Sequence, residues 1–363
     1  MKLRKTQLAA AVGAALLAGG TAVQAQNLQV QLYGQVNRAL MFADNEVQSK
    51  WFHVDGQPSS TRFGIMGTAQ AAPGLRIGAR IESEMKSNPS DTVSFATPST
   101  GAVGGNVLFA ERWLDLSFEG AWGKVNVGQG SGAADDASTI DLSGTGLANG
   151  SCLCDWGGAI PFTTSAGVAT ALTPATVINN NDFESRYDRA MYTTPVFGGF
   201  RAQAGFGQKG TGEVTEASIW YSGKLAGEIQ AAIGWSLDRT GTAAIPDHNE
   251  TIGGSISWLH TSGLNLTYNY TSATLTVSPA RDATYHFMKV GYKTGQHAFS
   301  VAYAMGDDQP AAGVEATAIA LGYTWTPIRW AEIYAGYIIY SVDVAGASLN
   351  DITTAQVGSR IRF

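Results

Sequence analysis

The cysteine pair is the first feature of this sequence that could carry chemistry. Cys152 and Cys154 are the only cysteines among the 363 residues, and they stand one residue apart as Cys-Leu-Cys. An oxidising compartment favours a disulfide between them, but so short a spacing makes a strained ring, so a labile bond or a free thiol pair is also consistent with the sequence. A metal site is disfavoured because no histidine lies nearby. We assign the pair no part in function.

The other residue types that could do chemistry form no catalytic set. The glycine-rich segments 128–132 and 144–150 match neither a nucleophile elbow nor a dinucleotide-binding turn. The acidic pairs at 135–136 and 307–308 could bind calcium, although isolated acidic pairs are usually solvated. The five histidines lack the spacing of metal ligands: His53, His248, His260, His286 and His297. The sequence therefore predicts that the protein is not an enzyme and has no cofactor, with calcium as the one candidate ligand.

Ionisable side chains do recur at a regular interval on one predicted strand. In residues 75–84, apolar side chains occupy one parity and ionisable side chains the other, namely Arg76, Arg80, Glu82 and Glu84. A strand face with four ionisable groups cannot lie in a dry core. That face must contact water, and the opposite face must contact lipid or a second sheet.

The same period of two recurs along most of the chain and predicts about sixteen strands. They are residues 29–37, 61–66, 75–84, 114–118, 125–127, 189–194, 200–208, 217–222, 229–235, 252–258, 264–270, 285–292, 299–303, 319–325, 333–339 and 357–363. Short turns alternate with longer loops, and Tyr and Trp recur near strand ends on the apolar face. This pattern is typical of a transmembrane β-barrel.

Composition agrees with this fold class. Hydrophobic residues make up 44% of the chain, and the mean hydropathy is -0.03. Beyond the N-terminus, no apolar run of about 18 residues could cross a bilayer as a helix. The 44 glycines and the aromatic content of 10% favour a barrel over a large soluble β protein. We therefore expect an all-β fold, a 16-stranded antiparallel transmembrane barrel.

The first 25 residues have the pattern of a secretory signal peptide. Lys2, Arg4 and Lys5 form a positive region, residues 8–18 an apolar core, and residues 23–25 a small-residue cleavage site. The apolar core is too short for a transmembrane anchor. We therefore expect residues 1–25 to be removed and residues 26–363 to form the barrel.

The charge balance becomes more acidic once the signal peptide is removed. The 23 basic residues fall by three, to 20, against 29 acidic residues, which gives a net charge near -9. This balance argues against nucleic acid as a partner and is compatible with a pore that favours cations. Solvated acidic loops account for most of this net negative charge.

One long segment, residues 130–182, has no strand rhythm of its own. A structureless connection of this length is uncommon in a compact fold unless it has a function. We expect it to fold into the barrel and narrow the bore.

Four short motifs carry a resemblance to a known family. They are Leu-Tyr-Gly-Gln-Val-Asn-Arg at residues 32–38, Ser-Thr-Arg-Phe-Gly at 60–64, the segment 186–200, and the ending Gly-Ser-Arg-Ile-Arg-Phe at 358–363. With these motifs in this order, the mature chain resembles the trimeric general diffusion porins of Gram-negative outer membranes, in the branch typical of alphaproteobacteria and related bacteria. The resemblance implies a homotrimer in the outer membrane, in contact with lipid and lipopolysaccharide.

The resemblance also implies a charged constriction. In such porins, acidic residues of the inward loop face basic residues on the opposite wall, and the field between them screens solutes. The matching residues here are Arg62 and Arg80 on the wall and Asp135, Asp136, Asp141 and Asp155 in the loop. Further candidates for the pore lining are Arg38, Arg112, Arg189, Glu82 and Glu84. Simple alternation places Arg38 and Arg112 on the apolar face.

The expected function is a water-filled channel for passive diffusion of small hydrophilic solutes and ions, with a weak preference for cations. Within the channel class, a substrate-selective porin is the alternative. An outer-membrane barrel hydrolase is a second alternative, but it would need an acid/base or nucleophile set that the sequence does not present.

Overall fold

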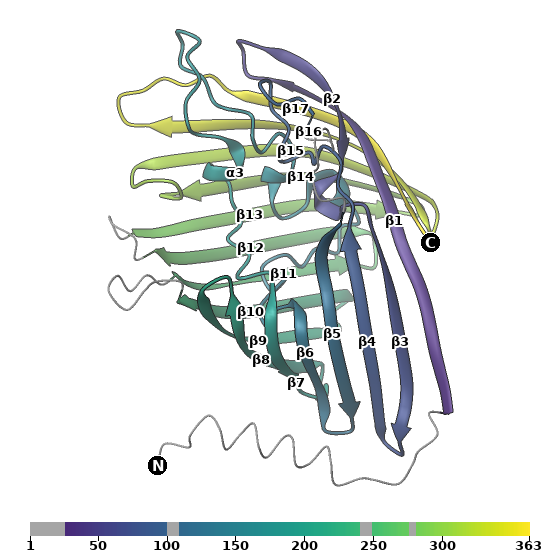
Figure 1. Ribbon diagram of the computed structural model, residues 1–363. Coiled ribbons are helices and arrows are strands. Elements are labelled where there is room, and N and C mark those ends of the chain that lie inside the picture. Colours follow the sequence, from purple (N-terminus) through teal and green to yellow (C-terminus); the bar gives the residue numbers. More distant parts are fainter. Residues whose placement is uncertain (1–25, 100–108, 240–248, 276–280) are drawn as a thin grey trace.

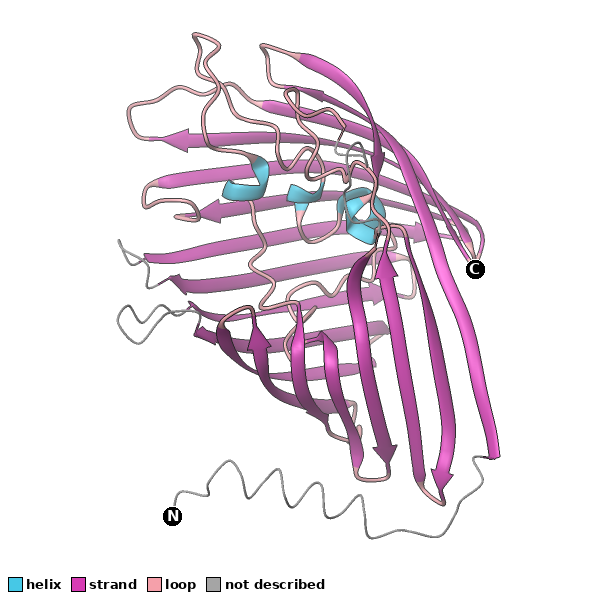
Figure 2. Cartoon of the chain, viewed as in Figure 1, coloured by secondary structure: helices cyan, strands magenta, loops and turns pink. Residues whose placement is uncertain are grey.

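The computed structural model describes residues 26–99, 109–239, 249–275 and 281–363. The expected signal peptide, residues 1–25, lies outside the described residues. In this part of the chain, no helix is long and apolar enough to cross a membrane. Figure 2 shows that strands form the wall and that the short helices lie inside it.

The strands form one antiparallel sheet that closes on itself (Figure 1). Closure joins β1 to β17, from Gln35 opposite Arg362 to Asp44 opposite Thr353. The prediction of a 16-stranded antiparallel barrel is confirmed. The strand bounds are β1 Gln26–Asp44, β2 Ser49–Asp55, β3 Arg62–Ala72, β4 Leu75–Glu84, β5 Ala110–Gly120, β6 Gly123–Ser131, β7 Arg186–Thr193, β8 Phe200–Lys209, β9 Gly212–Lys224, β10 Gly227–Arg239, β11 Asn249–His260, β12 Leu264–Leu275, β13 Arg281–Thr294, β14 His297–Asp307, β15 Val314–Ile328, β16 Ala331–Val344 and β17 Ile352–Arg362.

The second position of the barrel is shared by two strands, β2 and β3. Both pair with β1, β2 along its second half and β3 along its first half. Between them, the short helix η1 (Gln57–Ser59) leaves the wall. The sequence analysis did not predict β2, because both faces of this strand carry apolar side chains: Phe52 and Val54 point inward and Trp51 points outward.

The outer and inner faces of the wall differ as the alternation predicts. On the outer face, Ile81 is 57% exposed and Leu114 is 54% exposed. The adjacent Glu82 and Asp115 point inward and are buried. At one end of the barrel the strands join through tight turns such as 73–74 and 121–122, which is typical of the periplasmic end.

The connection between β6 and β7, residues 132–185, folds into the barrel (Figures 1 and 2). It contains α2 (Gly146–Asn149), the 3₁₀ turn η2 (Leu153–Asp155) and α3 (Pro174–Val177). The expectation of a long inward loop is confirmed. We refer to residues 132–185 as the inner loop.

The inner loop packs against one side of the lumen and makes a small hydrophobic core there. Trp156, Ile160 and Phe162 of the loop are almost fully buried. The strand face beneath them carries small side chains, namely Ala302, Ala304, Ala316, Ala318 and Ala320. A Cβ on Gly336 would lie 2.6 Å from the Trp156 ring, so glycine there allows the close approach. The inward face of β14–β16 is therefore apolar because the loop covers it.

Polar side chains of the strands bind the backbone of the inner loop at intervals. Ser255 Oγ donates to the carbonyl of Ala137 at 2.7 Å and accepts from the amide of Ile140 at 3.0 Å. Tyr340 Oη lies 2.7 Å from the carbonyls of both Leu153 and Trp156. These bonds satisfy loop groups that would otherwise be buried without partners.

A further anchor is Lys289 on β13, whose side chain has no exposed surface. Its Nζ lies 2.7 Å from Asp141 Oδ2 and donates to the carbonyl of Asn149 at 2.5 Å. Burial acts to raise the pKa of Asp141, but the Lys289 ammonium prevails and holds that pKa below its usual value. Asp141 is thus neutralised by an ion pair that ties the loop to the wall.

Replacing Lys289 tests this attachment. In Lys289→Met, the Asp141 carboxylate loses its buried partner, which costs about 3–5 kcal/mol for a pair of this kind. We expect unfolding at a lower temperature in a heat-modifiability assay and noisier open-channel currents. Lys224→Met, at an exposed lysine on β9, is the matched control. Combining Lys289→Met with Asp141→Asn should recover part of the loss; equal stability of Lys289→Met and wild type would contradict the role of this ion pair.

Candidate pore constriction

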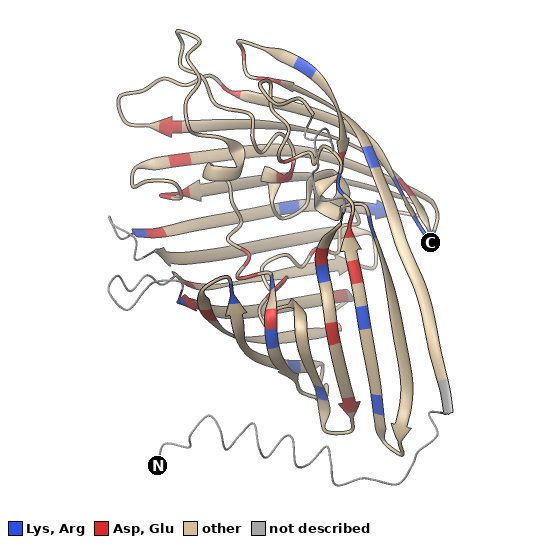
Figure 3. Ribbon diagram, viewed as in Figure 1, with Lys and Arg blue, Asp and Glu red and all other residues tan. Residues whose placement is uncertain are grey.

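A cavity of about 970 Å³ lies between the inner loop and the opposite wall. Its lining comes from η1, from the inner loop, from β3, β4, β5 and β7, and from a few residues of β11, β12, β16 and β17. Figure 3 shows both signs of charge along β4 and β5 and few charges on the strands beneath the loop. The charged side chains are therefore concentrated where the loop leaves the lumen open.

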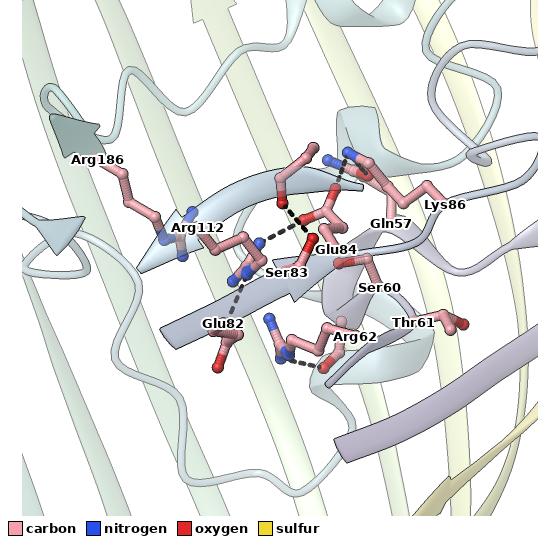
Figure 4. Close-up of polar contacts among 12 residues, drawn as sticks. Gln57, Ser60, Thr61, Arg62, Glu82, Ser83, Glu84, Lys86, Arg112 and Arg186 are labelled. Carbon is pink, nitrogen blue, oxygen red and sulfur yellow. Dashed lines mark hydrogen bonds and ion pairs between the residues drawn. The ribbon is translucent and has the colours of Figure 1, made fainter. Parts of the chain in front are cut away.

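Three arginines form a row on the wall of this cavity: Arg62 of β3, Arg112 of β5 and Arg186 of β7 (Figure 4). The like charges of Arg112 and Arg186 both act on Arg62. Arg62 donates to Ser59 Oγ of η1 at 3.0 Å, and no described carboxylate lies within 4.0 Å of it or of Arg186. Arg62 and Arg186 therefore present unpaired positive charge to the cavity.

Arg112 faces the lumen because the pairing of β4 with β5 shifts at this point. Glu82 pairs with Trp113 and Ser83 pairs with Glu111, so Arg112 is an extra residue in β5. Such a bulge changes the direction of a side chain relative to simple alternation. Arg112 Nε lies 2.7 Å from Glu82, and its Nη1 lies 2.5 Å from Glu84. Alternation thus gave the wrong face for Arg112.

Arg80 lies on the lumenal side but is not part of the cavity wall. Its guanidinium lies 2.6 Å from Glu82 and stacks over the Trp113 ring at 4.0 Å. Tyr33 donates to the same carboxylate at 2.8 Å. Glu82 is consequently only 3% exposed, because its partners cover it. This face is lumenal as expected, but much of it is occupied by ion pairs rather than by water.

Two other candidates lie away from the open lumen. Arg38 points to the outer surface, as alternation predicts, where it lines a shallow groove and lies 3.7 Å from Asp55. Arg189 is completely buried in the wall, 2.9 Å from Asp115, and it also donates to the carbonyls of Gly128 and Ser131. Neither arginine lines the cavity.

The loop carboxylates Asp135, Asp136, Asp141 and Asp155 all line the cavity. Burial and the neighbouring Asp136 raise the pKa of Asp135 to about 6. Burial and the nearby Asp91 raise the pKa of Asp155 to about 8. Neither Asp135 nor Asp155 has a described cation within ion-pair distance.

The sequence analysis missed several residues of the cavity wall. Asp182 lies near the end of the inner loop and Arg186 is the first residue of β7. Arg360 of β17 also lines the wall and is paired with Glu332 at 2.5 Å. The sequence analysis also assigned no element to residues 57–59, which form η1. Arg186 could have been found from its place at the boundary between loop and strand, whereas Arg360 could be placed only by closure of the barrel.

The neck of the inner loop is held by Glu216 of β9, which the sequence analysis also missed. This carboxylate accepts from the amide of Ala134 on the outgoing limb and from the amide of Glu184 on the returning limb, both at 3.2 Å. Tyr187 donates to it at 3.0 Å. One buried acidic side chain thus joins both ends of the loop.

The two cysteines form a disulfide at η2, with their Cα atoms 5.0 Å apart. Both border the cavity beside Asp155. The sequence had left the redox state undetermined.

Solved porins share this architecture. The anion-selective porin from Comamonas acidovorans superposes with a TM-score of 0.67 at 19% identity, covering 93% of this chain and 100% of that one. OmpF from Salmonella typhi, in complex with daunomycin, gives 0.62 at 12% identity, covering 94% and 99%. The trimer form of OmpT from Vibrio cholerae gives 0.61 at 14% identity, covering 93% and 100%. At these identities the likeness establishes the fold.

Sequence comparison identifies the family. No curated protein is significantly similar to the chain in sequence. The family model described as Gram-negative porin, however, matches residues 9–358, nearly the whole chain. The chain therefore belongs to the Gram-negative porin family.

Proposed function

We propose that this channel passes small hydrophilic solutes and ions by passive diffusion, with a weak preference for cations. Membership in the family makes the chain an outer-membrane diffusion channel and not an enzyme. The proposal adds the selectivity. It rests on one observation, the unequal number of unpaired charges of the two signs around the cavity.

Unpaired acids outnumber unpaired bases on the described cavity wall. Of the four arginines in this lining, Arg112 and Arg360 are paired with a carboxylate, which leaves Arg62 and Arg186. The acids without an ion-pair partner are Asp91, Asp135, Asp136, Asp155 and Asp182. The raised pKa values of Asp91, Asp135, Asp155 and Asp182 reduce this acidic excess at neutral pH. A small net negative charge remains, which supports a weak preference for cations.

The Comamonas acidovorans porin, by contrast, is described as anion-selective. The shared fold does not transfer this property, because selectivity depends on the charges that line the pore rather than on the barrel. In the present chain, Arg112 and Arg360 are each paired with a carboxylate, so their positive charges do not favour anions in the pore.

We also propose a homotrimer, with one sector of the outer wall covered by neighbouring subunits. The strands β1, β3, β4 and β5 contain one tyrosine and one tryptophan, Tyr33 and Trp113, and both point into the lumen. Their outer face carries aliphatic residues and phenylalanine, but no tyrosine or tryptophan. Most of the outward Tyr and Trp residues that could contact the membrane interface are on β7–β16, including Tyr192, Tyr221, Trp258, Tyr292 and Tyr323, and Trp51 of β2 is an exception. We propose that this second sector contacts lipid and lipopolysaccharide.

Matched substitutions on the two sectors test the assembly. Ile81 and Ile319 are 57% and 53% exposed on the outer surface. We expect Ile81→Asn to shift the protein from trimer to monomer in native mass spectrometry under mild detergent, and Ile319→Asn to leave the trimer intact. A monomeric wild type, or equal behaviour of the two variants, would exclude the proposed interface.

Neutralising the unpaired arginines should strengthen the cation preference. A unit charge at about 5 Å in water contributes about 0.8 kcal/mol, which corresponds to about a fourfold change in permeability ratio. We expect a rise of this size for Arg62→Gln and for Arg186→Gln, and a shift towards anions for Asp136→Asn. The measurement is the reversal potential in a salt gradient. Arg76→Gln, at an exposed arginine outside the cavity, is the control. Unchanged reversal potentials in all three variants would mean that these residues do not set selectivity.

Selectivity should also depend on pH. Asp135 and Asp155 are neutral below their pKa values, about 6 and about 8, and negative above them. Raising the pH from 5 to 9 should therefore increase the ratio of cation to anion permeability in two steps. Asp155→Asn should remove the upper step, whereas Asp343→Asn, at an exposed residue of β16, should keep both. An upper step that survives in Asp155→Asn would have to come from another group.

A further inference from the structure

Three carboxylates meet at the neck of the inner loop. Asp135 and Asp136 lie at the start of the loop and Asp182 near its end, and one oxygen from each lies within 4.8 Å of the others. All three line the cavity. The sequence had suggested calcium at two pairs of neighbouring acidic residues, 135–136 and 307–308. The fold brings Asp182 to the first pair, whereas Asp307 and Asp308 belong to no such cluster among the described residues.

The carboxylate of Asp135 is the feature that points to a ligand. Asp135 is 8% exposed, and its Oδ2 has no hydrogen-bond partner among the described residues. Leaving a buried charged oxygen unpartnered is costly. The other two members already have partial support, since Asp182 accepts from Ser138 Oγ at 2.7 Å and from the amide of Asp136 at 3.3 Å. An incoming ligand would therefore complete the coordination of Asp135.

No side chain nearby neutralises this cluster. Arg186 and Arg112 attract Asp135, but neither comes within ion-pair distance, and Arg112 is already bound to Glu82 and Glu84. Lys209 is paired with Glu184 at 3.0 Å, and Glu216 adds another acid to the surroundings. No described basic side chain therefore forms an ion pair with the cluster.

We propose that Asp135, Asp136 and Asp182 form a binding site for one hard divalent cation, Ca²⁺. Calcium takes six to eight oxygen ligands at about 2.3–2.6 Å in flexible geometry, and carboxylates bind it through one or both oxygens. Three carboxylates facing an aqueous cavity supply part of this shell, and water supplies the rest. The cluster offers no nitrogen or sulfur ligand, which disfavours zinc and copper.

The cation would join the two limbs of the inner loop at their neck. Asp135 and Asp136 belong to the outgoing limb and Asp182 to the returning limb, so one ion coordinated by all three resists their separation. The bound ion would also make the charge beside the cavity less negative. Calcium binding should therefore both stabilise the loop and shift selectivity towards anions. The binding itself does not depend on the selectivity proposed above.

The experiment measures calcium binding directly on the purified full-length protein in mild detergent. After removal of divalent ions with EDTA, equilibrium dialysis with ⁴⁵Ca²⁺ should show one saturable site per protomer. Asp182→Asn and Asp136→Asn should weaken binding by about tenfold or more, because each removes a charged ligand. The double variant Asp307→Asn/Asp308→Asn, which alters the acidic pair outside the cluster, should bind as the wild type does.

Two further measurements separate calcium binding from a purely structural effect of the substitutions. Calcium should raise the unfolding temperature of the wild type and of the Asp307→Asn/Asp308→Asn control but not that of Asp182→Asn. Asp136 is exposed, so Asp136→Asn should fold normally and keeps the test valid if a more buried variant does not fold. Absence of saturable binding up to 10 mM Ca²⁺, or equal binding by wild type and Asp136→Asn, would overturn the proposal and leave shared protons as the explanation of the cluster.

Discussion

The structure depends on the requirement that a loop folded into a barrel must find partners for its backbone. In the inner loop, amides and carbonyls cannot all reach water, and the strands supply the missing partners. Ser255, Tyr340 and Lys289 bind the middle of the loop, and Glu216 binds both limbs at the neck. The lumenal face therefore has two kinds of surface. One is dry and holds the loop; the other is charged and borders the cavity.

Ion pairing decides which charges of the second surface act on solutes. Charges such as Arg80, Glu82 and Arg189 belong to short ion pairs inside the wall and contribute little field at a distance. Arg62 and Arg186, by contrast, have no described acid within ion-pair distance and border the cavity. Counting the charged residues on lumenal strands therefore overestimates the positive charge that the wall presents to the cavity. The net charge that acts on solutes in the bore depends on a few unpaired groups and on the protonation of loop carboxylates.

The fold was largely predictable because the physics of a barrel strand is local. A period of two with an apolar outer face appears in each segment separately, so strand positions and the even strand number could be derived without tertiary information. The exceptions are local departures from this pattern. At Arg112 a bulge turns the side chain inward, and in β2 the inward residues are apolar because they face the packed loop. Neither departure can be recognised from the alternation of polar and apolar residues alone.

The sequence by itself determined the closed all-β wall, its two faces and the long inward loop, since these follow from alternation and from the length of one segment without strand rhythm. It also placed the cavity acids Asp135, Asp136, Asp141 and Asp155 in that loop. Only the tertiary structure decided which charges remain unpaired and which distant residues meet. Lys289 neutralises Asp141 across 148 positions, and Asp182 joins Asp135 and Asp136 from the far end of the loop. Such contacts depend on the path of the loop through the lumen, which many weak anchors set together and which no single segment of sequence encodes.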